Sequence, residues 1–120
     1  MVYSIYKGQV VAGQGIGSKE LLPTINLDPS VLGSDLDFGV YSCFVYLLEK
    51  KYLAMMHYGR RSTDSTISLE FHVIDQILDL EIDTLTFQPI KYIRGVLEFE
   101  SLHDIKKQLG LDLIKIVNND

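Results

Sequence analysis

The stretch Val40–Tyr58, VYSCFVYLLEKKYLAMMHY, predicts the fold more directly than any other part of the sequence. It contains two runs, Val40–Leu48 and Tyr52–Tyr58, whose aromatic and β-branched residues are typical of strands. The polar segment Glu49–Lys51 between them predicts a tight turn. The sequence therefore indicates an antiparallel hairpin in the middle of the chain.

Similar short runs lie on both sides of this hairpin, and clusters of Gly, Pro and Asp separate them. They predict four more strands, at Ser4–Val11, Thr24–Leu27, Thr66–Ile74 and Asp83–Arg94. Six short strands in one open sheet would leave two free edges, and closure into a barrel removes those edges. We therefore expect a closed barrel.

The pattern changes after Arg94. Ser101, followed by Asp104, resembles a helix N-cap with an acidic residue in the first turn. Apolar residues then recur at three- and four-residue spacing, which places them on one helical face: Leu102, Ile105, Leu109, Leu113 and Ile116. Gly110 marks a point where this helix could bend or break. The predicted fold is all-β, a six-stranded closed barrel with a C-terminal α-helix packed on it, in one domain over residues 1–120.

Composition narrows the class of protein. The net charge is -5, and a general nucleic-acid binder normally carries a basic face, so we expect no nucleic-acid partner. The single cysteine, Cys43, excludes an intrachain disulfide and a multi-cysteine metal site. No apolar run approaches the roughly 20 residues that span a bilayer, and the N-terminus lacks a signal-peptide pattern. We expect a cytoplasmic monomer that does not bind a membrane.

The first segment with chemical potential is the glycine-rich stretch Gly13–Lys19. Alternate glycines allow the backbone to approach a phosphate, and successive N–H groups can form an anion-binding nest. Lys19 adds a positive charge. Alternatively, this segment is only a glycine-rich turn between two strands and binds no ligand.

The second segment holds Thr24 and Asn26. Residues two apart on a strand point to the same face, so a hydroxyl and a carboxamide oxygen would lie side by side. Such oxygens suit Mg²⁺, which keeps several waters and takes phosphate oxygens as further ligands. The alternative is that both side chains only satisfy a turn at the start of a strand.

The third segment is Thr66–Asp75, in which Ser68, Glu70 and His72 share one face of a predicted strand. Desolvation raises the pKa of a partly buried glutamate and can make it a general base. Alternatively, this face is in contact with water and the three polar side chains lie on the surface.

Together these segments resemble the riboflavin kinase family, over nearly the whole chain. The motifs that carry the resemblance, in chain order, are Tyr6–Gly13 with Gly15-x-Gly17-Ser18-Lys19, Pro23-Thr24-x-Asn26-Leu27, Gly39-Val40-Tyr41, Gly59-x-Arg61-x-Thr63, Leu69-Glu70-x-His72-x-x-Asp75, and Ile93-Arg94 with Phe99-x-Ser101-Leu102 and Asp112.

The resemblance implies a Greek-key barrel and transfer of the γ-phosphate of ATP to the 5′-hydroxyl of riboflavin, giving FMN and ADP, with Mg²⁺ or a similar divalent cation. It implies that Glu70 is the catalytic base and that Thr24 and Asn26 hold the metal. The nucleotide-binding residues would be Gly15, Gly17, Ser18, Lys19, Thr24 and Asn26. The flavin-binding residues would be Arg94, Phe99 and Leu102.

Two other classes of function stay open. Leu21 and Leu22 precede Pro23, where the family usually has a glycine two residues before this proline. The glycine loop before Pro23 is thus shorter than the family's loop. This difference favours, as an alternative, a non-catalytic barrel that binds a flavin or a nucleotide. The other alternative is a small interaction barrel without a ligand, because barrels host many functions.

Overall fold

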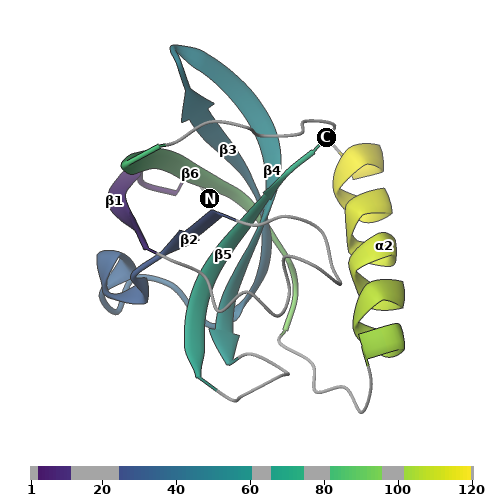
Figure 1. Ribbon diagram of the computed structural model, residues 1–120. Coiled ribbons are helices and arrows are strands. Elements are labelled where there is room, and N and C mark those ends of the chain that lie inside the picture. The colour runs from purple at the N-terminus through teal and green to yellow at the C-terminus, as the bar shows by residue number, and fades with distance from the viewer. Residues whose placement is uncertain (1–2, 12–24, 61–65, 75–81, 96–101, 120) are drawn as a thin grey trace.

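A computed structural model of the chain describes residues 3–11, 25–60, 66–74, 82–95 and 102–119, and in the last helix the side chains of residues 107, 108 and 110–117. The described part contains six strands, one 3₁₀ helix and one α-helix (Figure 1). Their bounds are β1 Tyr6–Val11, β2 Ile25–Leu27, η1 Pro29–Leu32, β3 Gly39–Leu47, β4 Lys50–Arg60, β5 Ile67–Val73, β6 Thr84–Arg94 and α2 Leu102–Asn119.

The strands form a closed antiparallel barrel in the order β1-β2-β5-β4-β3-β6. The consecutive strands β3, β4 and β5 lie side by side, and β6 returns to pair with β3, which is a Greek-key arrangement. β1 then joins β6 to β2 and closes the barrel. The predicted fold, a six-stranded closed barrel with one C-terminal helix, is confirmed.

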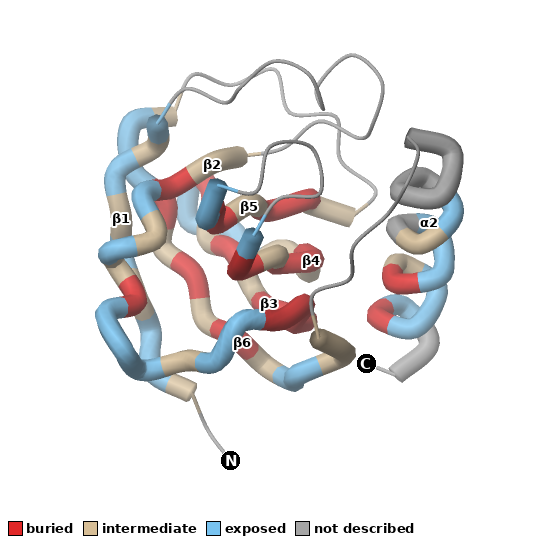
Figure 2. The backbone as a smooth tube through the Cα atoms, turned by 90° about the horizontal axis from the view of Figure 1, so that it is seen from below, coloured by how far each residue is buried: buried red, intermediate tan, exposed pale blue. Residues whose placement is uncertain are grey.

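The barrel interior is the main hydrophobic core. Alternate residues of each strand point inward, as the period of a strand requires, and Figure 2 shows buried positions on β3, β4 and β5. The fully buried inward side chains include Cys43, Val45, Ala54, Met56, Leu69, Phe71, Leu85 and Phe87. Phe71 and Phe87 meet at the centre with their ring centroids 4.7 Å apart. The intervening residues face outward, toward either solvent or α2.

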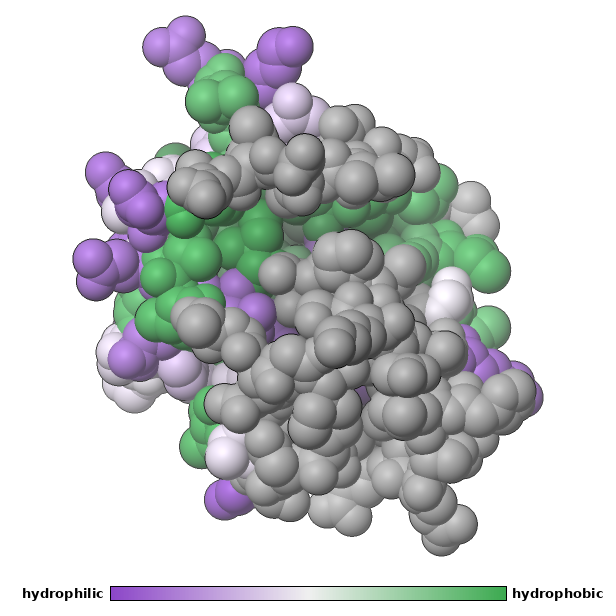
Figure 3. All heavy atoms as spheres, viewed as in Figure 1, coloured by the Kyte–Doolittle hydropathy of each residue, from purple (hydrophilic) through white to green (hydrophobic). Residues whose placement is uncertain are grey.

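The turn of the β3–β4 hairpin begins one residue earlier than predicted and has two residues instead of three. The turn consists of Leu48 and Glu49, because Lys50 already pairs with Leu47. Both turn residues have positive φ, 49° and 67°, which is the pattern of a two-residue I′ turn and normally favours Asn and Gly. The hairpin tip projects from the barrel at the top of Figure 3, with a hydrophobic group between hydrophilic ones. Leu48 is 75% exposed there.

The double substitution Leu48→Asn with Glu49→Gly is expected to stabilise the chain by about 1–2 kcal/mol, because a left-handed conformation costs most L-residues about that much and costs Asn and Gly less. Urea denaturation of both proteins measures the difference. The exchange Leu48→Ala with Glu49→Ala is the control: it removes the same side chains without relieving the backbone, and we expect no gain from it. Equal stabilisation by the two pairs would contradict a backbone origin.

The structure also contains a short element that the sequence analysis did not predict. η1 follows Asp28, whose carboxylate accepts a hydrogen bond from the Ser30 backbone N–H at 2.9 Å. That hydrogen bond lowers the pKa of Asp28. Leu32 at the end of η1 is buried and belongs to the barrel core. η1 therefore covers one end of the barrel.

α2 lies beside the barrel and covers part of its outer face (Figures 1 and 2). Ile116 packs against Val40 and Met55, and Leu113 packs against the same cluster. The helix continues through Gly110, so the bend considered there does not occur. The side chains of Leu102, Ile105 and Leu109, which were predicted to lie on the buried face, are not among those described.

Candidate active site

A row of side chains runs around the outside of the barrel and brings the two central predicted residues together. Asn26 on β2 lies opposite Glu70 on β5, and Glu70 lies opposite His57 on β4. The row continues from His57 to Val40 on β3, and from Val40 to Arg94 on β6. Directly opposed residues in antiparallel strands share a face, with Cβ atoms about 4.5–5.5 Å apart. The predicted metal ligand and the predicted base are therefore neighbours.

This row faces outward rather than into the core. Leu27, Leu69, Phe71 and Met56, the neighbours of Asn26, Glu70 and His57 along their strands, point into the barrel. Strand residues alternate between the two faces. Val40, also in the row, packs against Ile116 of α2, so the row ends under the helix.

The polar face of β5 is largely shielded from water. Ser68 is 9% exposed and His72 is 6% exposed, while Glu70 between them is half-buried. These values contradict the alternative of a solvated surface for Ser68 and His72, and Glu70 is partly shielded. A partly shielded carboxylate on a strand can serve as a general base when the substrate hydroxyl comes within hydrogen-bond distance.

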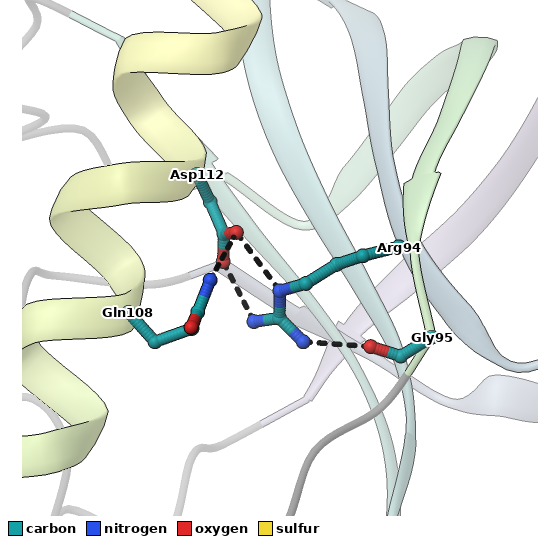
Figure 4. Close-up of polar contacts among 4 residues, drawn as sticks. All are labelled: Arg94, Gly95, Gln108 and Asp112. Carbon is teal, nitrogen blue, oxygen red and sulfur yellow. Dashed lines mark hydrogen bonds and ion pairs between the residues drawn. The ribbon is translucent and has the colours of Figure 1, made fainter.

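Arg94 connects the barrel to the helix (Figure 4). Its Nε–H donates to Asp112 Oδ1 at 2.8 Å, and its Nη2 donates to Asp112 Oδ2 at 2.6 Å. Gln108 Nε2 donates to Asp112 Oδ1 at 3.0 Å, and Arg94 Nη1 donates to the Gly95 carbonyl at 2.7 Å. The Asp112 side chain is fully buried and that of Arg94 is 14% exposed, so this is a buried, bidentate ion pair.

This pair gives Arg94 a structural role that the sequence analysis did not assign. A guanidinium carries five N–H donors, and three of these N–H groups of Arg94 are bonded to described residues. Its role toward a flavin stays a prediction.

His57 is the neighbour of Glu70 that the sequence analysis did not single out. Its place follows from the β4–β5 register, in which His57 is opposite Glu70 and Met55 is opposite His72. Residues 61–66 separate β4 from β5 in the sequence. The register could therefore not be counted from a turn of known length.

Most of the predicted nucleotide-binding residues lie outside the described residues. These are Gly15, Gly17, Ser18, Lys19 and Thr24, and Phe99 of the predicted flavin set is also outside. Leu102 is the first residue of α2, but its side chain is not described. Their assignments stay predictions.

The oxygen donors at Asn26 and Glu70 fit a magnesium ion that also takes substrate phosphates as ligands. Within the described ranges, no group of three or more His, Cys, Asp or Glu side chains could hold a metal ion. Asn26 offers a half-buried carboxamide beside the carboxylate of Glu70. Mg²⁺ commonly binds through one or two protein ligands together with waters and substrate phosphates, which fits such a donor set.

Cys43 is not a candidate nucleophile. Its side chain is fully buried inside the barrel, and burial raises the pKa of its thiol. The neighbouring barrel residue Tyr41 donates its hydroxyl proton to the Asp37 carbonyl at 2.7 Å, and burial raises the pKa of Tyr41 to about 12. Both residues are therefore structural.

In the part of the chain that the structure describes, no helix is long and apolar enough to cross a membrane.

Comparison with known proteins agrees with this fold. Residues 2–118 match the family model described as Flavokinase, riboflavin kinase. No curated protein matches the chain in sequence.

Two solved structures show the same fold. One, described as a macrolide-efflux protein from Streptococcus pneumoniae, has a TM-score of 0.78 and 27% identity over 97% of this chain. This chain spans only 39% of that protein's length. The other, riboflavin kinase from Trypanosoma brucei, has a TM-score of 0.62 and 17% identity, and the match covers 95% of this chain and 77% of that one.

Proposed function

We propose that this chain, which belongs to the riboflavin kinase family, transfers the γ-phosphate of ATP to the 5′-hydroxyl of riboflavin and releases FMN and ADP. The observation that best supports this proposal is the pairing of Asn26 with Glu70 on adjacent strands. In this pairing a carboxamide that could hold a metal ion or a phosphate lies beside a half-buried carboxylate, and a kinase needs both kinds of group at the reacting hydroxyl.

In the proposed reaction Glu70 accepts the proton of the riboflavin 5′-hydroxyl. The hydroxyl oxygen forms a bond to the γ-phosphorus as the bond from that phosphorus to the β,γ-bridging oxygen breaks. ADP leaves with the electron pair of the broken bond, and the proton stays on Glu70 until the product departs. Phosphoryl transfer depends mostly on positioning and on charge neutralisation, so one well-placed base is sufficient.

Asn26 and Thr24 would hold a divalent cation, for which Mg²⁺ fits the oxygen donors best. When bound, such an ion neutralises negative charge on the phosphates of ATP. Gly15, Gly17, Ser18 and Lys19 are proposed to bind the same phosphates through backbone N–H groups and one ammonium. Asn26 has a fixed place on β2, which lets it orient the phosphates toward Glu70.

The flavin is proposed to lie near Arg94, Phe99 and Leu102, where β6 leads into α2. The ion pair between Arg94 and Asp112 joins these two elements. In this proposal the ion pair holds β6 and α2 in a fixed arrangement where they contact the flavin. Location in the cytoplasm and a monomeric state stay predictions.

Asn26→Ala is expected to weaken the binding of ATP measured with Mg²⁺ by at least about tenfold, because loss of a group that holds or orients a metal ion typically costs 10- to 100-fold in affinity. Isothermal titration with and without a chelator measures the effect. The control is Thr84→Ala, which removes an exposed polar side chain from β6. We expect no change with the control. ATP affinity that is equal for wild type and Asn26→Ala, or equal with Mg²⁺ and with chelator, would contradict the metal assignment.

A further inference from the structure

The turn of the β3–β4 hairpin contains a leucine that does not belong to the hydrophobic core. Leu48 is 75% exposed, more than any other large hydrophobic side chain in the described part of the chain. Its φ of 49° is a left-handed conformation, which costs an L-residue free energy, and Glu49 after it has a φ of 67°. Leu48 therefore combines a strained backbone with an apolar side chain in contact with water.

These two unfavourable features indicate that Leu48 serves a function outside the fold. One exposed apolar side chain is ordinary by itself, but backbone strain at a position where the fold does not require it is typical of functional sites. Asn at this position would relieve the strain and remove the exposed apolar surface, with no loss of core packing. An apolar surface outside this chain that covers Leu48 would explain why a leucine is present.

The residues that follow Leu48 bring positive charge to both faces of the hairpin. Lys50 pairs with the buried core residue Leu47 and so lies on the inner face, whereas Lys51 pairs with Tyr46 on the outer face. Both lysines are exposed, and neither forms an ion pair with a described residue. The tip of the hairpin thus has an apolar apex and one ammonium group on each side of it.

Two tyrosines lie behind the lysines, toward the barrel. Tyr46 is on the outer face, and Tyr52 pairs with the core residue Val45 on the inner face; both tyrosines are half-buried. Tyrosine, with an apolar ring and a polar hydroxyl, is favoured where water meets the apolar part of a membrane. Strands rise by about 3.3 Å per residue, so these side chains begin within roughly 10 Å of the apex. Apolar surface elements enter a bilayer to a similar depth, about 5–10 Å.

This order of side chains fits a membrane surface better than a protein surface. The tip projects from the rest of the molecule in Figure 3, with a hydrophobic group between hydrophilic ones. Lipid would surround both faces of the hairpin and contact Lys50 and Lys51 together, whereas a flat protein surface would contact one face. Two lysines outnumber Glu49 at the tip, which favours anionic lipids. Charges elsewhere on the chain are screened beyond about 8–10 Å.

We propose that the tip of the β3–β4 hairpin attaches the protein to the surface of an anionic membrane. Leu48 enters the layer between the headgroups and the acyl chains, and Lys50 and Lys51 contact the lipid phosphates. The expectation of no membrane contact came from the lack of an apolar run that could span a bilayer, and attachment to a surface needs no such run. One leucine and two lysines give weak, reversible binding. The inference does not depend on the proposed kinase activity.

The test measures co-sedimentation of the purified full chain with vesicles of phosphatidylcholine, alone or mixed with phosphatidylserine. Leu48→Asn should weaken binding to the mixed vesicles by about tenfold or more, because burial of a leucine side chain contributes at least that factor. The melting temperature of the same variant should be unchanged or raised, since Asn suits the turn. Lys50→Gln with Lys51→Gln should weaken binding to the mixed vesicles by about fivefold for each lysine and leave binding to phosphatidylcholine unchanged.

Ile114→Asn and Lys91→Gln are the matched controls. Ile114 is 59% exposed on α2, and Lys91 is an exposed lysine on β6. Neither substitution should change binding to either kind of vesicle. Binding that Ile114→Asn abolishes and Leu48→Asn leaves intact would overturn the proposal, because α2 would then be the membrane contact. Wild type that binds neither kind of vesicle would also overturn it, and an apolar pocket in another protein would become the better explanation of Leu48.

Discussion

Replacement of Glu70 by glutamine is expected to lower the turnover of riboflavin by about 10²–10⁴-fold, the usual effect of losing a general base. Glutamine keeps the size and shape of the side chain and cannot accept the proton. Riboflavin and ATP should still bind with nearly wild-type affinity, because the lost interaction acts mainly in the transition state. FMN formation measured under saturating substrates, together with binding titrations, separates the two effects.

The control for this experiment is Glu49→Gln. Glu49 lies in the turn of the β3–β4 hairpin, away from the Glu70 row, and carries the same functional group. Turnover by Glu49→Gln should equal that of wild type. Wild-type turnover by Glu70→Gln would show that Glu70 takes no proton, and the mechanism above would be wrong.

Arg94→Ala is expected to destabilise the protein by about 3–5 kcal/mol, because it leaves the fully buried carboxylate of Asp112 without its cation. Gln108 would remain as a neutral donor to that carboxylate and cannot balance its charge. Urea denaturation measures the loss. Lys91→Ala is the control on the same strand; Lys91 is exposed, and we expect a change within about 0.5 kcal/mol.

The double variant Arg94→Met with Asp112→Leu distinguishes two causes of lost stability: an unpaired buried charge and the loss of side-chain packing. Replacing both charges with apolar groups of similar size should cost much less than Arg94→Ala, because no buried charge is left unpaired. If Arg94→Ala were as stable as Lys91→Ala, the apolar contacts of Leu113 and Ile116 would be sufficient to hold α2.

The strands could be predicted from sequence to within two residues at every end, because local composition largely determines them. β3 was predicted at Val40–Leu48 and lies at Gly39–Leu47, and β6 was predicted at Asp83–Arg94 and lies at Thr84–Arg94. β4 extends further at both ends than the predicted Tyr52–Tyr58, since Lys50 and Lys51 pair across the hairpin. Cross-strand pairing overrides the weak strand preference of lysine there.

Other features depend on contacts between distant parts of the chain. The pairing of Asn26 with Glu70 joins residues far apart in the sequence, and only the closed barrel sets its register. The ion pair of Arg94 with Asp112 requires α2 to pack at one angle against β6. Residues with suitable functional groups could thus be picked out from the sequence, but which of them lie next to each other depends on the strand register of the barrel.

The most direct test of the proposed function is FMN formation by the wild-type chain. The purified protein is incubated with riboflavin, ATP and Mg²⁺, and the flavins are separated by chromatography, with parallel samples that contain a chelator or the Glu70→Gln variant. We predict FMN and an equal amount of ADP with wild type and Mg²⁺, and little of either in the parallel samples. Riboflavin that binds to the wild-type protein but stays unphosphorylated in the complete mixture would contradict the kinase and favour a flavin-binding barrel without catalytic activity.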